Sequence, residues 1–249
     1  MTEKQVVYDD LYIDTVYGPF VEKYRIIFID DYIDFYMMKR VLLQFYKYVE
    51  EDNNSPIHVM INSQGGLLDA AFAFISEIEL CDCHVITYNI GYAISAAAKI
   101  FLAGDLRIMY PYSSITLHSI RSGKYGVVNN FSNYAEYLKK YNIIIKDYLK
   151  RKTKLDDEAI KGILDYDNEF TCLAEEAIEY GLADQIYAGR IFIPPRSTSQ
   201  YNYNYALVSK QCDDLINKRK DNKEQYREEV LNGRNKKIKK RDSKEKERV

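Results

Sequence analysis

Two short features of the sequence carry residue types that acyl-transfer chemistry needs. Ser95 lies among small residues in the segment 91–98, where a strand-like run gives way to a small, apolar, helix-like run. A serine on such a turn is exposed, and the N–H group of the next residue can stabilise a developing oxyanion. His118 ends a later strand-like segment, and histidine is the residue most often used as a general base. The pair predicts nucleophilic catalysis by serine.

A glycine turn could complete an oxyanion-binding site. Gly65 and Gly66 stand between a predicted strand and a predicted helix, so backbone N–H groups can face outward at a helix N-terminus. Each feature alone also has an ordinary structural explanation: a serine at a helix start is commonly an N-cap, paired glycines commonly form a turn, and a single histidine is commonly structural. The prediction therefore rests on the combination. The glycines do not form the G-x-G-x-x-G pattern of dinucleotide-binding proteins.

The hydrophobic pattern predicts the elements that position these turns. Short runs rich in β-forming residues predict strands, and apolar spacings of three and four predict helices. In chain order we expect the strand 25–29, the helix 34–51, the strand 58–61, the helix 67–80, the strand 85–90, the helix 95–102 and the strand 115–118. This alternation predicts an α/β fold of stacked, largely parallel βαβ units.

Three further helices are predicted after the histidine, over residues 131–152, 154–164 and 174–180. Thr153 and Asp156 are spaced as a capping box for the second of them. Gly181 is typical of the residue that ends a helix in a left-handed conformation.

Composition divides the chain into an N-terminal arm (1–21), a central domain (22–195) and a charged C-terminal tail (196–249). Residues 210–249 contain 15 Lys and Arg against 9 Asp and Glu and few apolar residues, which is typical of a solvated tail. Acidic residues interrupt the basic ones and no aromatic platform accompanies them, so we expect no nucleic-acid binding. No apolar run reaches the roughly 18 residues that span a bilayer, and no signal peptide is visible, so we expect a cytoplasmic protein without a membrane segment.

The four cysteines do not predict a metal site. Cys81 and Cys83 are separated by one residue, which is closer than the usual spacing of zinc ligands, and no second pair of Cys or His completes a site. Cys172 and Cys212 stand alone. We expect ordinary thiols.

The order of the motifs resembles the Clp protease family over residues 22–187. The segment 61–66 reads I-N-S-Q-G-G, similar to the family's I-N-S-P-G-G, and 91–98 matches a G-x-A-x-S-x-x-A nucleophile motif. The segment 117–120 holds the histidine of the family's I-H-Q-P motif, and 174–184 matches the pattern A-E-E-A-x-E-Y-G-L-x-D.

The resemblance leaves the third catalytic acid open. An ungapped match to the last motif selects Glu169 and leaves Leu173 as a poor helix cap. A two-residue insertion selects Asp167 and lets Thr171 cap the helix, and for that reason we favour Asp167. Two other departures are Gln64 in place of the family's proline, which frees the backbone φ of the loop, and the absence of Gln-Pro after the histidine.

The resemblance implies a serine endopeptidase that hydrolyses short peptides or unfolded proteins and needs no metal or organic cofactor. In the family's scheme Ser95 is the nucleophile, His118 the general base and Asp167 or Glu169 the acid that orients the histidine. The oxyanion-hole positions are Gly66 and Ala96. The positions that bind an extended substrate are Leu67, Arg121, Ser122 and Gly123.

The resemblance also implies an architecture and partners. The fold would be crotonase-like, with stacked βαβ units and a protruding long helix. Seven-membered rings would stack through that helix and enclose the sites, and an ATP-driven AAA+ unfoldase would feed them.

Three alternatives stay open. A phage-type relative of the same fold could mature capsid proteins, and gene neighbourhood would separate it from a general protease. A catalytically silent ring subunit would need a broken triad, whereas Ser95 and His118 are both present. An acyl-CoA enzyme of the crotonase fold would use paired N–H groups over a thioester without a Ser/His pair.

Overall fold

The structure is a computed structural model, and it describes residues 18–122, 128–166, 168–187 and 225. Four features predicted from sequence lie outside the described residues: most of the N-terminal arm, the C-terminal tail apart from residue 225, Gly123 of the substrate-binding positions and the favoured third acid, Asp167.

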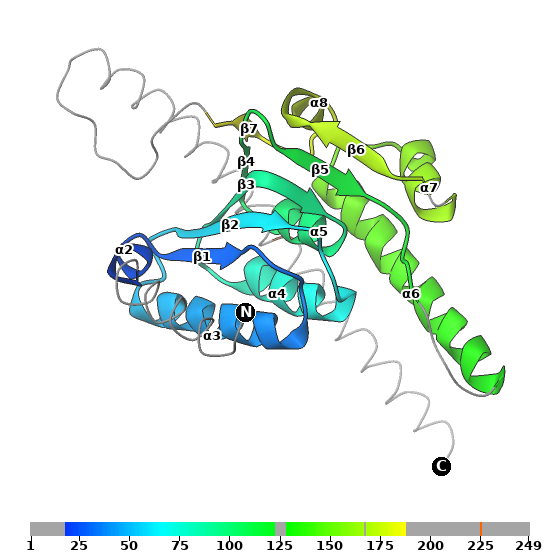
Figure 1. The fold of residues 1–249 in the computed structure, drawn as a ribbon, viewed down its shortest axis with the longest axis horizontal. Helices are drawn as coiled ribbons and strands as arrows, with labels where there is room; N and C mark the ends of the chain where they lie inside the picture. Colours follow the sequence, from blue (N-terminus) through cyan, green and yellow to red (C-terminus); the bar gives the residue numbers. More distant parts are fainter. Residues whose placement is uncertain (1–17, 123–127, 167, 188–224, 226–249) are drawn as a thin grey trace, which may run out of the picture.

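A single mixed sheet organises the chain (Figure 1). Its parallel part has the strand order β1-β2-β3-β4-β7, and β5 pairs in parallel with the end of β3 while β6 pairs antiparallel with β5. The strands are β1 (Ile26–Ile29), β2 (Ile57–Ser63), β3 (Val85–Ile94), β4 (Leu106–Met109), β5 (Ser114–Leu117), β6 (Phe170–Leu173) and β7 (Gln185–Ile186).

Helices connect the parallel strands, and α3 and α4 lie together on one side of the sheet in Figure 1. The long helix α6 projects away from the sheet. The helices are α2 (Gly18–Lys23), α3 (Phe35–Glu51), α4 (Leu68–Leu80), α5 (Ala96–Ala103), α6 (Val128–Lys152), α7 (Asp157–Asp165) and α8 (Ala174–Glu179). The predicted α/β fold of stacked βαβ units with a protruding long helix is confirmed.

The sequence prediction missed part of the sheet. β3 runs through Gly91 to Ile94, although glycine usually weakens a strand. A Cβ at Gly91 would lie 2.4 Å from Oδ1 of Asn62, so the absence of a side chain lets β3 pass close to β2. The strands β4, β6 and β7 were not predicted from the sequence.

The predicted capping box before α7 is wrong, although the helix itself is present. Asp156 is the N-cap, and its Oδ1 accepts a 2.7 Å hydrogen bond from the N–H of Ala159. The hydroxyl of Thr153 instead donates to the carbonyl of Leu149 at the end of α6 and accepts from the N–H of Leu155. Thr153 therefore closes the preceding helix.

The predicted C-terminus of α8 is confirmed. Gly181 has φ +66, and its N–H donates to the carbonyl of Ile178. The carbonyl of Ala177 accepts from Leu182, which completes a left-handed glycine end.

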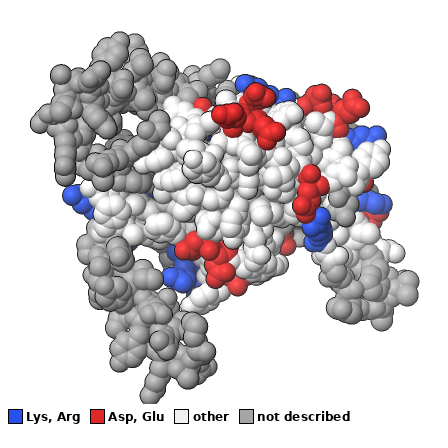
Figure 2. Space-filling view, turned by 45° about the horizontal axis from the view of Figure 1, so that its top comes forward, with Lys and Arg blue, Asp and Glu red and all other residues white. Residues whose placement is uncertain are grey.

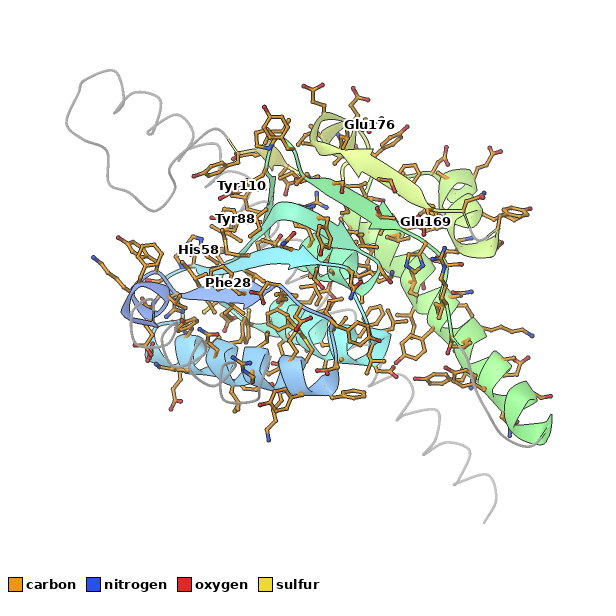
Figure 3. All side chains as sticks on the ribbon, viewed as in Figure 1. Phe28, His58, Tyr88, Tyr110, Glu169 and Glu176 are labelled. Carbon is orange, nitrogen blue, oxygen red and sulfur yellow. The ribbon has the colours of Figure 1, made fainter. Side chains whose placement is uncertain are left out.

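Buried side chains form a core on each side of the sheet. The larger cluster packs β1, β2 and β3 against α3, α4 and α5. A smaller cluster on the other side is formed by Ile26, Met60, Ile86, Tyr88, Leu106 and Ile108. Figure 3 shows Phe28, His58, Tyr88 and Tyr110 on this second side, away from α3 and α4. In the view of Figure 2 the middle of the visible face carries few charged side chains, while Asp and Glu gather along its edges.

Two ion pairs with buried carboxylates connect later elements to the rest of the fold. Asp184, just before β7, accepts hydrogen bonds from Nε and Nη2 of Arg107 in β4, and both side chains are less than a tenth exposed. Glu79 of α4 pairs with Lys152 of α6 at 2.9 Å. No helix in the described part of the chain is long and apolar enough to cross a membrane.

Candidate active site

Ser95 occupies a strained turn between β3 and α5. Its backbone has φ 60° and ψ −117°, in a region that residues other than glycine rarely adopt. Ser95 is the N-cap residue of α5, yet its side chain makes no capping hydrogen bond. The hydroxyl therefore does not serve the helix, which is the usual use of serine at this position.

The Gly65-Gly66 turn is held in place by Ile33. The carbonyl of Gly65 accepts from the N–H of Ile33 at 2.9 Å, and the N–H of Leu67 donates back to the carbonyl of Ile33 at 2.6 Å. Because backbone groups alternate in direction along an extended segment, these two bonds direct the N–H of Gly66 away from Ile33.

The same turn packs against the start of α5. A Cβ placed on Gly65 would lie 2.9 Å from Cβ of Ser95 and 3.0 Å from the backbone N of Ala96. Both glycines also have positive φ, at +92° and +154°, where side chains are disfavoured. The structure thus brings the two predicted turns into contact, with the N–H of Ala96 at the first turn of a helix.

Strand pairing brings His118 to the serine turn. β3 and β5 are parallel, with Ile94 opposite Thr116, and the N–H of Ser95 donates to the carbonyl of Thr116 at 2.9 Å. His118 is the first residue after β5. Since neighbouring strands lie about 5 Å apart, the register places His118 beside the first residues of α5.

The ring of half-buried His118 has a defined hydrogen bond. Its Nδ1 lies 2.5 Å from the carbonyl of Ser119. A carbonyl only accepts, so Nδ1 carries the proton in the neutral ring and Nε2 is left as the basic nitrogen. Among the hydrogen bonds of the described residues there is none between the Ser95 hydroxyl and His118. In enzymes without substrate such contacts are often long and tighten in the complex.

Several neighbours act on the pKa of His118. Burial lowers the pKa most, the carbonyl of Ser119 raises it, and the positive charges of Lys99 and Arg121 lower it further. The charge of Glu169 raises it. The net effect is a pKa below the ordinary value of 6.5, so the imidazole is neutral over a wider pH range than in a free histidine.

The antiparallel pair β5–β6 places Glu169 close to the histidine. Leu117 lies opposite Phe170, and one further step of this register puts Glu169 opposite His118. In the structure Oε1 of Glu169 pairs with Nη2 of Arg121 at 3.1 Å, and both side chains are about half exposed. Glu169 therefore lies beside His118 but is bound to another partner.

The reason for preferring Asp167 over Glu169 does not hold in the structure. Thr171 lies within β6, where its hydroxyl bonds the hydroxyl of Thr116 at 2.9 Å. The N-cap of α8 is Leu173, whose N–H donates to Oε2 of Glu176 at 2.9 Å. Leu173 therefore begins α8 although its side chain cannot cap the helix. The two-residue insertion that would make Thr171 the cap is not needed.

Of the substrate-binding candidates, Leu67, Arg121 and Ser122 lie in the described part of the chain, and none of these three belongs to a strand. Arg121 and Ser122 are exposed and have no regular secondary structure. The hydroxyl of Ser122 bonds that of Tyr134 in α6. Leu67 is 38% exposed at the start of α4.

Sequence reasoning missed one charged residue of this site. Lys99 is only 3% exposed, and its Nζ donates to the carbonyl of Ser95 at 3.3 Å. Burial lowers the pKa of Lys99 to about 8. The spacing of four residues from Ser95 was the available signal, because residues i and i+4 share a helix face.

The fold and site define an α/β protein of stacked βαβ units with a serine, a histidine and a glycine turn gathered at one end of β3 and β5. The chain belongs to the Clp protease family, whose model matches residues 11–190. A similar protein is the ATP-dependent Clp protease proteolytic subunit 1 of Rhodopirellula baltica, which is 27% identical over 174 residues, covering 69% of this chain and 76% of that protein.

Proposed function

We propose that the chain is a serine-type endopeptidase with Ser95 as nucleophile and His118 as general base. The observation that carries the proposal is the conformation of Ser95: a non-glycine residue held at φ 60° whose hydroxyl does not cap the helix it precedes. Such strain persists where the surrounding structure enforces it, and it is typical of functional sites. Membership of the Clp protease family supports the same function.

In the first half of the reaction the Ser95 hydroxyl attacks the carbonyl carbon of a peptide bond and His118 takes its proton at Nε2. The resulting oxyanion accepts hydrogen bonds from the N–H groups of Gly66 and Ala96. The C–N bond then breaks, and His118 gives the proton to the leaving amine. An acyl group remains on Ser95.

In the second half a water molecule attacks the acyl group, and His118 again takes a proton at Nε2. Collapse of the second tetrahedral intermediate breaks the bond to Oγ, and the proton returns to Ser95. The acidic product leaves and the serine is restored. The described residues supply every proton transfer in this cycle.

For the third member of the triad we propose Glu169 or Asp167, and the β5–β6 register favours Glu169. A carboxylate that accepts from Nδ1 would replace the Ser119 carbonyl and stabilise the imidazolium. Glu169 would have to leave Arg121 to do so. Both pairing partners are about half exposed, and an ion pair of that exposure is weak, worth about 1 kcal/mol or less.

We propose that Leu67 and the segment Arg121 to Gly123 bind an extended substrate through backbone hydrogen bonds. Such pairing adds a strand to an exposed edge and tolerates many sequences. The irregular segment after β5 would become a strand only when the substrate pairs with it.

We further propose a cytoplasmic homo-oligomer of stacked seven-membered rings, served by an AAA+ unfoldase. The name of the Rhodopirellula baltica protein, a proteolytic subunit of an ATP-dependent protease, supports this assembly. The division into an arm (1–21), a peptidase domain (22–195) and a tail (196–249) belongs to the same proposal.

Labelling with a fluorophosphonate probe tests the function directly, because the probe reacts covalently only with an activated serine. We expect labelling of Ser95 in the wild type, none in Ser95→Ala, and a loss of several orders of magnitude in rate in His118→Ala. Ser114→Ala, which changes a hydroxyl on β5 outside the site, is the matched control. Labelling of Ser95→Ala as fast as wild type would overturn the assignment.

A further inference from the structure

Lys99 is a buried cation in a place where a cation is costly. All eight residues of α5 are buried, and Lys99 is 3% exposed. Its Nζ turns back toward the first turn of the helix and donates to the carbonyl of Ser95. The N-terminus of a helix already carries partial positive charge, so an ammonium group there is doubly disfavoured.

No carboxylate in the described ranges compensates this charge. The elements packed on α5 include α4, α6, β3 and β5. The buried acid of α4, Glu79, is paired with Lys152 and Arg151. From α6 the hydroxyl of Tyr148 donates to the Lys99 carbonyl at 2.6 Å, which fixes the backbone of Lys99 and not its ammonium group.

Three charged side chains in the described part of the chain act on the pKa of His118. They are Lys99 from α5, Arg121 from the segment after β5 and Glu169 from the segment before β6. Arg121 and Glu169 are half exposed and neutralise one another. Solvent screens such a pair strongly, whereas the charge of Lys99 is buried and is screened much less.

We propose that Lys99 is a positioning residue of this site. Its ammonium group holds the carbonyl of Ser95 through a hydrogen bond and places a buried positive charge beside His118. The inference rests on the proposed function, since it deepens the account of the same site. The hydrogen bond from Lys99 helps to hold the backbone of Ser95 in its strained conformation. The charge disfavours the imidazolium form, so that His118 is ready to accept a proton at a lower pH.

The proposal predicts opposite effects of one substitution on stability and on the site. Lys99→Met keeps the length and most of the volume of the side chain and removes a desolvated charge, so we expect an equal or higher melting temperature. In the same variant the pKa of His118 rises, since a repelling charge has gone. Lys99→Arg keeps the charge and should keep the histidine close to the wild type.

The test uses two readouts on the full-length protein. Diethyl pyrocarbonate acylates the neutral form of a histidine ring and not the protonated form. The pH dependence of its reaction with His118, followed by mass spectrometry, therefore reports the protonation of His118 without any peptidase activity. Fluorophosphonate labelling of Ser95 over the same pH range reports the proposed function. Lys161→Met removes an exposed lysine on α7 and is the matched control for the change in net charge.

We expect the midpoint of His118 modification to move to higher pH in Lys99→Met and to stay in place in Lys99→Arg and Lys161→Met. The acidic limb of Ser95 labelling should move in the same direction. An unchanged His118 midpoint in a folded Lys99→Met protein overturns the proposal, as does an equal shift in Lys161→Met. A shifted His118 midpoint without any labelling of wild-type Ser95 would uphold the role of Lys99 and refute the peptidase function.

Discussion

The N–H of Ser95 donates a 2.9 Å hydrogen bond to the carbonyl of Thr116, two residues before His118. This bond continues the parallel pairing of β3 with β5 and holds the serine turn beside the strand that His118 follows. Both residues are therefore positioned by the sheet and not by flexible loops, which is the arrangement that a precise site requires.

The strained backbone of Ser95 predicts that two inactive variants differ in stability. Ser95→Ala and Ser95→Gly both remove the nucleophile and should abolish labelling. Glycine adopts the combination of φ 60° and ψ −117° without a steric cost, and the cost for other residues is about 1–3 kcal/mol. We expect Ser95→Gly to unfold at higher urea concentration than Ser95→Ala. Equal midpoints would show that the turn is not strained in solution.

The pH dependence of labelling follows from the lowered pKa of His118. The base must be neutral, so the rate falls as the pH falls through this pKa. Because burial, Lys99 and Arg121 together place the pKa below 6.5, the midpoint of the acidic limb should lie below 6.5. The measurement is the second-order labelling rate from pH 4 to pH 8. A midpoint above 6.5 would contradict the electrostatics of the site.

The glycine turn predicts a severe effect of one methyl group. A Cβ at Gly66 would lie 2.2 Å from the carbonyl oxygen of Ile33, and φ there is +154°. Gly66→Ala should cost roughly 3 kcal/mol or more in unfolding free energy, near the upper end for single substitutions. Gly162→Ala on α7 is the control, because nothing lies within 4 Å of its Cβ and alanine should gain about 0.5–1 kcal/mol there. Similar stabilities of the two variants would refute the close approach.

The buried pair of Arg107 and Asp184 predicts a large loss when one partner is removed. Arg107→Met takes the guanidinium away from a carboxylate that is 9% exposed, and such losses are typically about 3–5 kcal/mol. The double variant Arg107→Met/Asp184→Leu removes both charges and should be markedly more stable than the single variant. Urea unfolding of both proteins measures the difference. A double variant no more stable than Arg107→Met would argue against the ion pair as the cause.

The elements predicted most accurately from the sequence are those in which the apolar spacing repeats over many residues. The helix ending at Glu51 and the long helix ending at Lys152 have many turns of apolar spacing, and both are present. The strand β6 has four residues, and Thr171 within it was expected to cap the following helix. That error came from local capping preference, whereas pairing with β5 decides the structure of this segment.

Some residues of the candidate site could be recognised from the sequence, and others only from the structure. The order of the motifs was sufficient to select Ser95, His118 and the glycine turn as candidates, because each lies at the end of a strand that the sequence predicts. Lys99 was missed although it lies four residues after Ser95, because lysine is almost never fully buried and is therefore read from sequence as an exposed residue. Only the packing of α5 shows that it is buried, and only strand register shows that Glu169 lies next to His118.

Glu169 and Asp167 are the two candidates for the acid of the triad. If Glu169 orients His118, Glu169→Gln should lower turnover by orders of magnitude, because the amide favours the wrong tautomer and cannot stabilise the imidazolium. Asp167→Asn should then be close to wild type. Loss of the Glu169 charge also lowers the pKa of His118, so the acidic limb of Glu169→Gln should move to lower pH even where the maximal rate is small. Steady-state kinetics on both single variants and the double variant separate the possibilities.

A control removes the competing partner of the same acid. Arg121→Gln frees Glu169 from its ion pair and should leave turnover of a short peptide equal to or above that of the wild type, with any loss confined to KM. A large loss in Asp167→Asn with near-normal Glu169→Gln would assign the role to Asp167. Near-normal single variants with an inactive double variant would mean that the two carboxylates replace one another. If all three variants kept full turnover, the Ser119 carbonyl alone would orient the histidine, and the site would work as a Ser-His pair.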